Sequence, residues 1–119
     1  MINAGSMMQT TIDDLTERVE IVYRETTQDA EGSIIDGEQK TRGTVWAKVL
    51  PLSAKNAEAY NETEKAVYFR VVVRYRTDVQ PTDVLLWRGK RLHLTAPAYD
   101  AESRKIWTVI DCKELVENA

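Results

Sequence analysis

The chain has 119 residues, of which 43% are hydrophobic and 29% are charged, as is typical of one folded domain with a single core. The formal net charge of −3 and the pI of about 5.2 argue against a dedicated nucleic-acid-binding protein. No apolar run approaches the roughly 20 residues that cross a bilayer. The single cysteine, Cys112, excludes an internal disulfide and fits a reducing cytosol.

The first residues have neither the cationic nor the apolar region of a secretory signal. We expect residues 1–14 to form a flexible lead-in, with Met7–Met8 as an alternative true start. A weak helix-start signal lies at Thr10–Thr16, where acidic residues follow a threonine. Residues 15–116 are then expected to form a single domain.

Alternating apolar residues predict a first strand over Arg18–Arg24 and a second over Arg42–Leu50. Pro51 should end the second strand, because proline cannot donate a hydrogen bond to a sheet ladder. The polar segment Thr26–Gly37 contains several turn-forming residues and is expected to be a hairpin loop between the two strands.

The segment Ser53–Lys65 differs from its neighbours because it is polar, contains alanine and has one β-branched residue, Thr63. Ser53 could cap a short helix there. The apolar face of such a helix is too small to anchor it firmly. We therefore expect a short helix or a long loop that joins two strands.

The strongest strand signal in the chain is Val67–Arg76, where side chains alternate between two rows. The first row is apolar and needs a core to face. The second row bears the arginines Arg70, Arg74 and Arg76, together with Tyr68 and Val72, and is expected to face solvent or an acidic partner. Such a strand fits a small barrel or sandwich that touches another protein.

The remaining sequence alternates between turn residues and short apolar runs. The expected elements are a turn at Thr77–Asp83, strands over Val84–Trp87 and Lys90–Pro97 joined at Arg88–Gly89, a turn at Asp100–Ser103 and a last strand over Arg104–Glu114. Together these elements predict a mostly β protein: a small antiparallel β-barrel of about six strands with one short helix or long loop insertion.

Residues suited to catalysis or to metal binding are sparse. His93 is the one histidine and Cys112 the one cysteine, which together cannot supply the four ligands of a structural zinc site. Cys112 has no partner base apparent in the sequence, and the phosphate-binding glycine-rich loop is missing. We therefore expect no enzymatic activity, no metal and no cofactor.

The arginine row leaves one alternative open. Arg70, Arg74 and Arg76 could contact phosphate, and three tryptophans (Trp46, Trp87 and Trp107) could stack on bases. The protein would then be a free-standing β-barrel module that binds single-stranded nucleic acid. The negative net charge and the usual burial of tryptophan in small barrels favour the other interpretation, in which the arginines contact a neighbouring subunit or a partner protein.

The order of these segments resembles the head–tail joining family of tailed bacteriophages, the connector or stopper proteins that lie between the portal and the tail. The similarity extends from about Leu15 to Glu114, and its most specific part is the pattern WAxVxPLS followed at the right distance by RxxxRY. The matching segments are Arg18-Val19 with Ile21, Asp29 to Gly32, Val45 to Ser53, Glu58-Ala59, Arg70 to Tyr75, Val79 to Pro81, Val84 with Gly89, and Cys112 to Glu114. One departure is Leu92, where the family often has an aromatic residue.

This resemblance implies a structural virion protein. It implies a ring of identical subunits under the portal or adaptor protein, through which double-stranded DNA passes without sequence-specific binding and by which the genome is retained until a tail docks. A tail-terminator or minor tail protein is an alternative within the same class. The implied location is the head–tail interface of the virion, after assembly in the cytoplasm of the bacterial host and without a membrane partner.

The resemblance also assigns roles to particular residues. The segment after the PLS motif points to the channel in such proteins, which here places five charged residues at the lumen: Lys55, Glu58, Glu62, Glu64 and Lys65. Acidic groups there would keep DNA from adhering to the channel. We assign Arg70, Arg74 and Arg76 to contacts with a neighbouring subunit or with the portal side.

Overall fold

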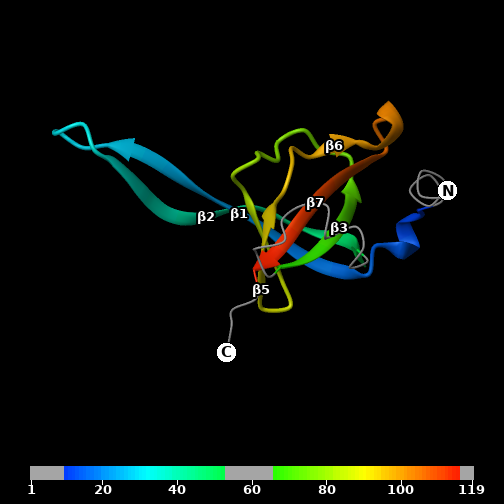
Figure 1. Cartoon of the computed structure of the whole chain (residues 1–119). Coiled ribbons are helices and arrows are strands. Elements are labelled where there is room, and N and C mark those ends of the chain that lie inside the picture. Colours follow the sequence, from blue (N-terminus) through cyan, green and yellow to red (C-terminus); the bar gives the residue numbers. More distant parts are fainter. Residues whose placement is uncertain (1–9, 53–65, 116–119) are drawn as a thin grey trace.

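The computed structural model describes residues 10–52 and 66–115. Seven strands and two short 3-10 helices make up this part of the chain (Figure 1). In chain order they are η1 (Ile12–Asp14), β1 (Glu17–Gln28), β2 (Ile34–Pro51), β3 (Ala66–Arg74), β4 (Val84–Trp87), β5 (Lys90–Leu94), β6 (Tyr99–Asp100), η2 (Ala101–Ser103) and β7 (Trp107–Leu115).

Six of these strands form an antiparallel sheet that closes on itself. The strands follow the order β3, β2, β1, β4, β5 and β7, and pairing between β3 and β7 joins the last strand to the first. The two-residue strand β6 lies beside β7 on the edge that β5 also uses. The prediction of a mostly β, antiparallel fold of about six strands is confirmed, and closure removes the free edges that an open sheet would expose.

The core lies inside the closed sheet. Alternate residues of the paired strands point inward, and they include Val71 and Val73 from β3, Ile21 from β1 and Leu92 from β5, all almost completely buried. Leu92 is the residue that departs from the resembled family's pattern, and its side chain fills a core position. Cys112 belongs to the same cluster, with 1% of its surface exposed.

Burial gives the Cys112 thiol a testable pH effect. Desolvation raises the pKa of Cys112 to about 12 from the usual 9.0, because a thiolate is poorly solvated in an apolar core. Between these values the unfolded chain loses the thiol proton and the folded chain keeps it. Above pH 9 the free energy of unfolding should therefore fall by up to about 1.4 kcal/mol per pH unit from this group.

Denaturant unfolding at pH 8, 9 and 10 measures this effect, with Cys112→Ala as the control. The control retains every lysine and tyrosine that titrates in the same range. Its stability should therefore decline less steeply with pH than that of the unaltered protein. Equal slopes for the two proteins would show that the thiol does not contribute.

A second apolar cluster covers the outer face of β3 and β7. Val72 and Val109 pack there with Trp107, with Leu15 from the segment after η1 and with Ala101 from η2. This arrangement corrects one prediction: Val72 is fully buried and Tyr68 is 4% exposed, so the row that bears the arginines is not a solvent face. The middle of β3 is buried on both sides, which its continuous Val71-Val72-Val73 run reflects.

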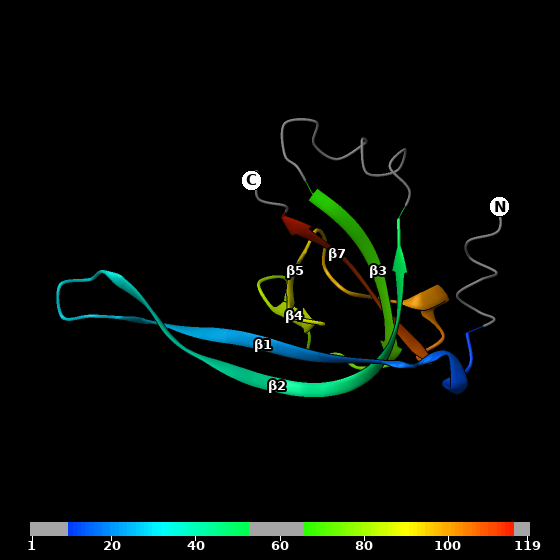
Figure 2. The same cartoon turned by 90° about the horizontal axis from the view of Figure 1, so that it is seen from below.

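The hairpin formed by β1 and β2 is longer than predicted. The strands remain paired as far as Gln28 and Ile34, so the expected loop Thr26–Gly37 is reduced to a short turn. The hairpin extends well beyond the other strands, as both views show (Figures 1 and 2). We call its distal part, residues 26–38, the arm.

A register shift in the arm requires a glycine. The pairing skips between Arg24 and Thr26 on one strand, and a Cβ at Gly37 would lie 2.9 Å from the Glu25 carbonyl oxygen. Real Cβ atoms essentially never lie so close to another atom, so a larger residue at this position would displace the backbone. Arg24 completes the arrangement by donating from Nη1 to the Gly37 carbonyl oxygen at 3.2 Å.

The limits of the later strands match the sequence prediction at β4 and differ from it by about three residues at β5 and β7. Strand β4 has the predicted limits, and the turn to β5 has positive φ at both Arg88 (50°) and Gly89 (77°), as a two-residue hairpin turn of this kind requires. Strand β5 ends at Leu94, before the predicted Pro97, and β7 begins at Trp107.

The predicted excursion Ser53–Lys65 lies outside the described residues. The residues on either side of it are held by the sheet. The Leu52 backbone N–H donates to the Tyr68 carbonyl oxygen at 2.9 Å, and Ala66 pairs with Leu115. Both flanks therefore lie at the same end of the closed sheet. Within the described ranges, none of the helices could span a membrane, since each is too short and too polar.

Candidate interaction surface

A groove of about 450 Å³ lies where η1 and the start of β1 approach the middle of β2 and the end of β3. Its walls combine exposed apolar or aromatic side chains with three arginines, and none of the lining residues is acidic. The lining residues are Ile12, Leu15, Arg18, Thr44, Val45, Trp46, Arg74, Tyr75 and Arg76.

Trp46 is held at this groove by an arginine. Arg18 and Trp46 are register partners of β1 and β2, and the Arg18 guanidinium carbon lies 4.6 Å from the ring centroid. A cation at this distance is attracted to the face of an indole ring. Trp46 nevertheless remains 52% exposed, so the stack leaves a large aromatic surface facing solvent.

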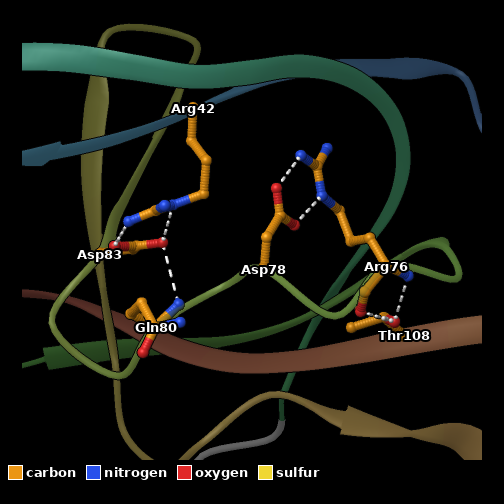
Figure 3. A network of polar contacts seen from close by, with 6 residues as sticks. All are labelled: Arg42, Arg76, Asp78, Gln80, Asp83 and Thr108. Carbon is orange, nitrogen blue, oxygen red and sulfur yellow. Dashed lines mark hydrogen bonds and ion pairs between the residues drawn. The ribbon is translucent and has the colours of Figure 1, made fainter.

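The chain that follows β3 is fixed to β7, which positions the opposite wall of the groove. The Tyr75 N–H donates to the Ile106 carbonyl oxygen at 3.0 Å. Arg76 is held twice by Thr108: its N–H donates to Thr108 Oγ1 at 3.0 Å, and that hydroxyl donates to the Arg76 carbonyl oxygen at 3.0 Å (Figure 3). This wall is therefore held in place by the sheet and does not behave as a free loop.

Arg76 forms an ion pair within the molecule. Its Nε and Nη2 donate to the two carboxylate oxygens of Asp78 at 2.6 and 2.8 Å (Figure 3). The hydrogen bond from Arg76 lowers the pKa of Asp78, and the same bond raises the pKa of Arg76. The guanidinium lies over Gly43, where a Cβ would be 3.2 Å from both of its terminal nitrogens.

Arg18 and Arg74 keep their charges available. Neither has an acidic partner within residues 10–52 and 66–115, and both are exposed. The groove therefore offers two accessible positive charges beside exposed aromatic rings. Such a surface suits an acidic partner with apolar side chains.

A second ion pair near the groove is structural. The register of β1 and β2 skips Arg42 between Ile21 and Val22, and Arg42 instead forms a two-bond pair with Asp83, at 2.7 and 2.9 Å (Figure 3). The Asp83 side chain is fully buried and also accepts the Gln80 N–H at 2.9 Å. The hydrogen bonds that Arg42 donates to Asp83 raise the pKa of Arg42. Because Asp83 joins Arg42 to the Gln80 backbone, this pair fixes the turn before β4.

The structure separates the three arginines that the sequence placed in one row. Arg74 and Arg76 line the groove, whereas Arg70 pairs with Asp111 across β3 and β7 at 2.8 Å. Their assignment to partner contacts stays a prediction. The residues assigned to the channel (Lys55, Glu58, Glu62, Glu64 and Lys65) lie outside the described residues.

Sequence reasoning did not group Arg18, Trp46 and Tyr75 with Arg74. One signal could have located Trp46: it alternates with Val45 and Ala47, so its side chain had to point away from the face that buries Ala47. Residues of η1 and of the end of β3 line the same groove although they are far apart in sequence, and no local pattern reveals this.

The arm is the second distinctive surface. Its turn is well formed: Asp29 Oδ1 accepts the N–H groups of Glu31 and Ser33 at 2.9 and 2.8 Å, and Gly32 has a φ of 88°. Beside this turn, Ile34 is 73% exposed and Ile35 is 48% exposed. Residues 26–38 contain four acidic side chains and no basic one.

Metal-binding side chains do not cluster in the described part of the chain. None of its histidine, cysteine and acidic side chains form a group that could hold a metal ion. His93 is exposed on β5, and the raised pKa of Cys112 leaves the thiol protonated at neutral pH. The groove and the arm both suit contact with a partner.

Comparison with known proteins decides the class of the protein. The family described as phage head completion protein matches residues 11–115. The chain belongs to this family. A search of the curated proteins finds no match.

Two solved structures share the fold. The solution structure of protein SF1141 from Shigella flexneri 2a has a TM-score of 0.70 and 27% sequence identity, and the alignment covers 92% of this chain and 100% of that one. A chain in the virion of the native gene transfer agent particle has a TM-score of 0.65 and 17% identity, covering 86% of this chain and 96% of that one. At that identity the second likeness shows the fold alone.

Membership in the phage head completion family makes this protein a structural component of a phage virion, which interacts with other virion proteins. The resemblance stated from the sequence is thereby confirmed. The match covers both the groove and the arm, so these surfaces belong to the family's domain and are not additions to it.

Proposed function

We propose that this head completion protein joins the phage head to the tail. Several copies form a ring beneath the portal or adaptor protein, double-stranded DNA passes through the ring, and the ring retains the genome until a tail protein docks. The observation that carries this proposal is the family match over residues 11–115. The exposed groove and arm supply the surfaces that such an assembly needs.

The proposal can be tested by disabling the gene in its phage or prophage and supplying the protein from a plasmid. We expect particles without the protein to have full-size heads that lose DNA and carry no tails, and we expect the plasmid to restore infectivity. Electron microscopy and nuclease-protected DNA are the readouts. Stable filled heads with tails of abnormal length would instead indicate a tail terminator, and normal infectious particles would contradict the proposal.

We further propose that residues 53–65 face the channel, with Lys55, Glu58, Glu62, Glu64 and Lys65 at the lumen. Support comes from the position of the flanking residues, because Leu52 and Ala66 leave the closed sheet at the same end. A segment attached there can be altered without disturbing a strand.

Replacing residues 53–65 with a short Gly-Ser linker should therefore leave a folded protein. Circular dichroism and thermal unfolding should match the unaltered protein, because the core and the ion pairs of the described residues are untouched. Complementation with this variant should give heads that fail to retain DNA. Filled, infectious particles would exclude a role in retention.

The alternative function, binding of single-stranded nucleic acid, has weaker support. Arg70 and Arg76 pair with carboxylates, and Trp107 is 8% exposed. Trp87 packs against the core and donates to Glu17. Of the proposed binding residues, Arg74 and Trp46 remain. Titration with an oligonucleotide at two salt concentrations tests it. We expect no steep, salt-dependent quenching of tryptophan fluorescence, whereas tight binding that weakens sharply with salt would favour this alternative.

A further inference from the structure

We infer that the arm of one copy docks in the groove of the next copy. This inference rests on the proposed function, in which several copies assemble at the head–tail joint, and it names the surfaces that hold the copies together. The proposed contact joins residues 26–38 of one subunit to the groove of its neighbour.

The two surfaces lie at opposite ends of the same strand. The groove includes Arg18, near the start of β1, and the arm begins near the end of this 12-residue strand. At about 3.3 Å per residue, Arg18 and Gln28 at the far end of β1 are roughly 30 Å apart. Pairing with β2 keeps β1 extended (Figure 2), so the arm cannot fold back into its own groove.

The charges of the two surfaces are complementary. Residues 26–38 contain four acidic side chains and no basic one, whereas the lining of the groove contains three arginines and no acidic residue. Two of those arginines, Arg18 and Arg74, have no acidic partner within the described ranges. An acidic arm seated there would supply that partner.

The apolar groups are complementary as well. Ile34 and Ile35 are strongly exposed on the arm, and because successive strand residues point to opposite faces, each face of the arm presents one isoleucine. A groove walled by Ile12, Trp46 and Tyr75 can contact both sides of an inserted hairpin. A two-stranded ribbon without other support is also marginally stable in water, so docking would stabilise the arm.

The proposed contact is heterologous, since one copy contributes the arm and the other the groove. Repetition of such a contact makes a ring if the rotation closes and a filament if it does not. An open oligomer of any length has one free arm at one end and one free groove at the other until the ring closes. This property allows a sharp test with purified full-length protein.

The test uses two variants that each disable one side of the contact. Ile34→Asp with Ile35→Asp disables the arm and leaves the groove intact, and Arg18→Glu with Arg74→Glu does the reverse. By sedimentation velocity we expect the unaltered protein to form species larger than dimers at high concentration and each variant to stay monomeric. An equimolar mixture of the two variants should form dimers and nothing larger, because only one intact arm and one intact groove remain per pair.

A charge-matched control, Lys90→Glu with Arg104→Glu, should assemble as the unaltered protein does, since neither residue lies on the arm or the groove. Disulfide trapping at high concentration detects a weaker contact. In a Cys112→Ala background, protein with Ile34→Cys mixed with protein with Thr44→Cys should form a covalent dimer, and Ile34→Cys mixed with Thr82→Cys should not.

Absence of both the mixed dimer and the specific disulfide would overturn the inference. So would assembly that survives both double variants, or an oligonucleotide that binds the groove while self-association is unaffected. These results involve no phage, so they are distinguishable from failure of the proposed function. That failure would appear as normal infectivity when the gene is disabled.

Discussion

Replacing Asp83 with alanine should lower the free energy of unfolding by roughly 3–5 kcal/mol, because the change leaves Arg42 without its buried partner. The Asp83 side chain is fully buried and the Arg42 side chain is 21% exposed, so water replaces little of the lost interaction. The Gln80 N–H also loses its acceptor. Guanidinium unfolding followed by tryptophan fluorescence measures the loss.

The control for this prediction is Asp78→Ala, which removes the similar pair with Arg76. The Asp78 side chain is 47% exposed, and pairs in contact with solvent contribute about 1 kcal/mol or less. The two variants remove the same charge from the same turn region. Equal effects would show that burial of Asp83 does not determine the strength of its pair.

Introducing arginine at Val72 should be among the most damaging single changes in the protein, with a loss of more than about 4 kcal/mol. A charge would enter the cluster formed with Leu15, Trp107 and Val109, where no acidic side chain belongs to the packing. Strand periodicity alone predicts the opposite, because it places Val72 in the row of arginines. The milder Val72→Ala should fold and lose about 1–3 kcal/mol.

The comparison is Val67→Arg, which periodicity assigns to the apolar row. Val67 is 39% exposed and is paired across the sheet with Glu114, so an arginine there gains an opposite charge. We expect a change within about 1 kcal/mol. If Val67→Arg proved more damaging than Val72→Arg, the outer cluster would not exist in solution.

Local sequence patterns predicted the turns and strand ends that are determined by neighbouring residues. The β4–β5 hairpin follows from two short apolar runs around Arg88-Gly89, and the structure has its turn there. Proline at position 51 likewise marks the end of β2. In each case one turn or one backbone constraint decides the conformation, so a short window of sequence contains the information.

Long-range contacts account for what the sequence did not reveal. Burial of Val72 depends on Leu15 and Ala101, which approach β3 from both directions along the chain. The β1–β2 hairpin extends through the predicted loop because Gln28 pairs with Ile34, although both residues lie in a polar stretch with abundant turn formers. The turn propensity of these residues favoured a loop, but pairing between β1 and β2 makes the segment a strand.

The candidate site also combines residues that the sequence identified with contacts that it did not reveal. The arginines of β3 were identified from the sequence, but their distribution between an internal pair and the groove depends on the register with β7. Arg70 faces Asp111 in that register, whereas Arg74 is opposite Trp107 and has no carboxylate to meet. Registers between strands this distant in sequence cannot be determined from composition or periodicity.

The anchoring of Leu52 to Tyr68 and of Ala66 to Leu115 has an evolutionary consequence. Both ends of the connection between β2 and β3 are held by the sheet, so a change in the number of residues between them leaves every strand pairing intact. Doubling the length of a flexible connection costs only about 0.6 kcal/mol of closure entropy. Descendants of one ancestral gene can therefore gain or lose residues at this point while inheriting the same scaffold.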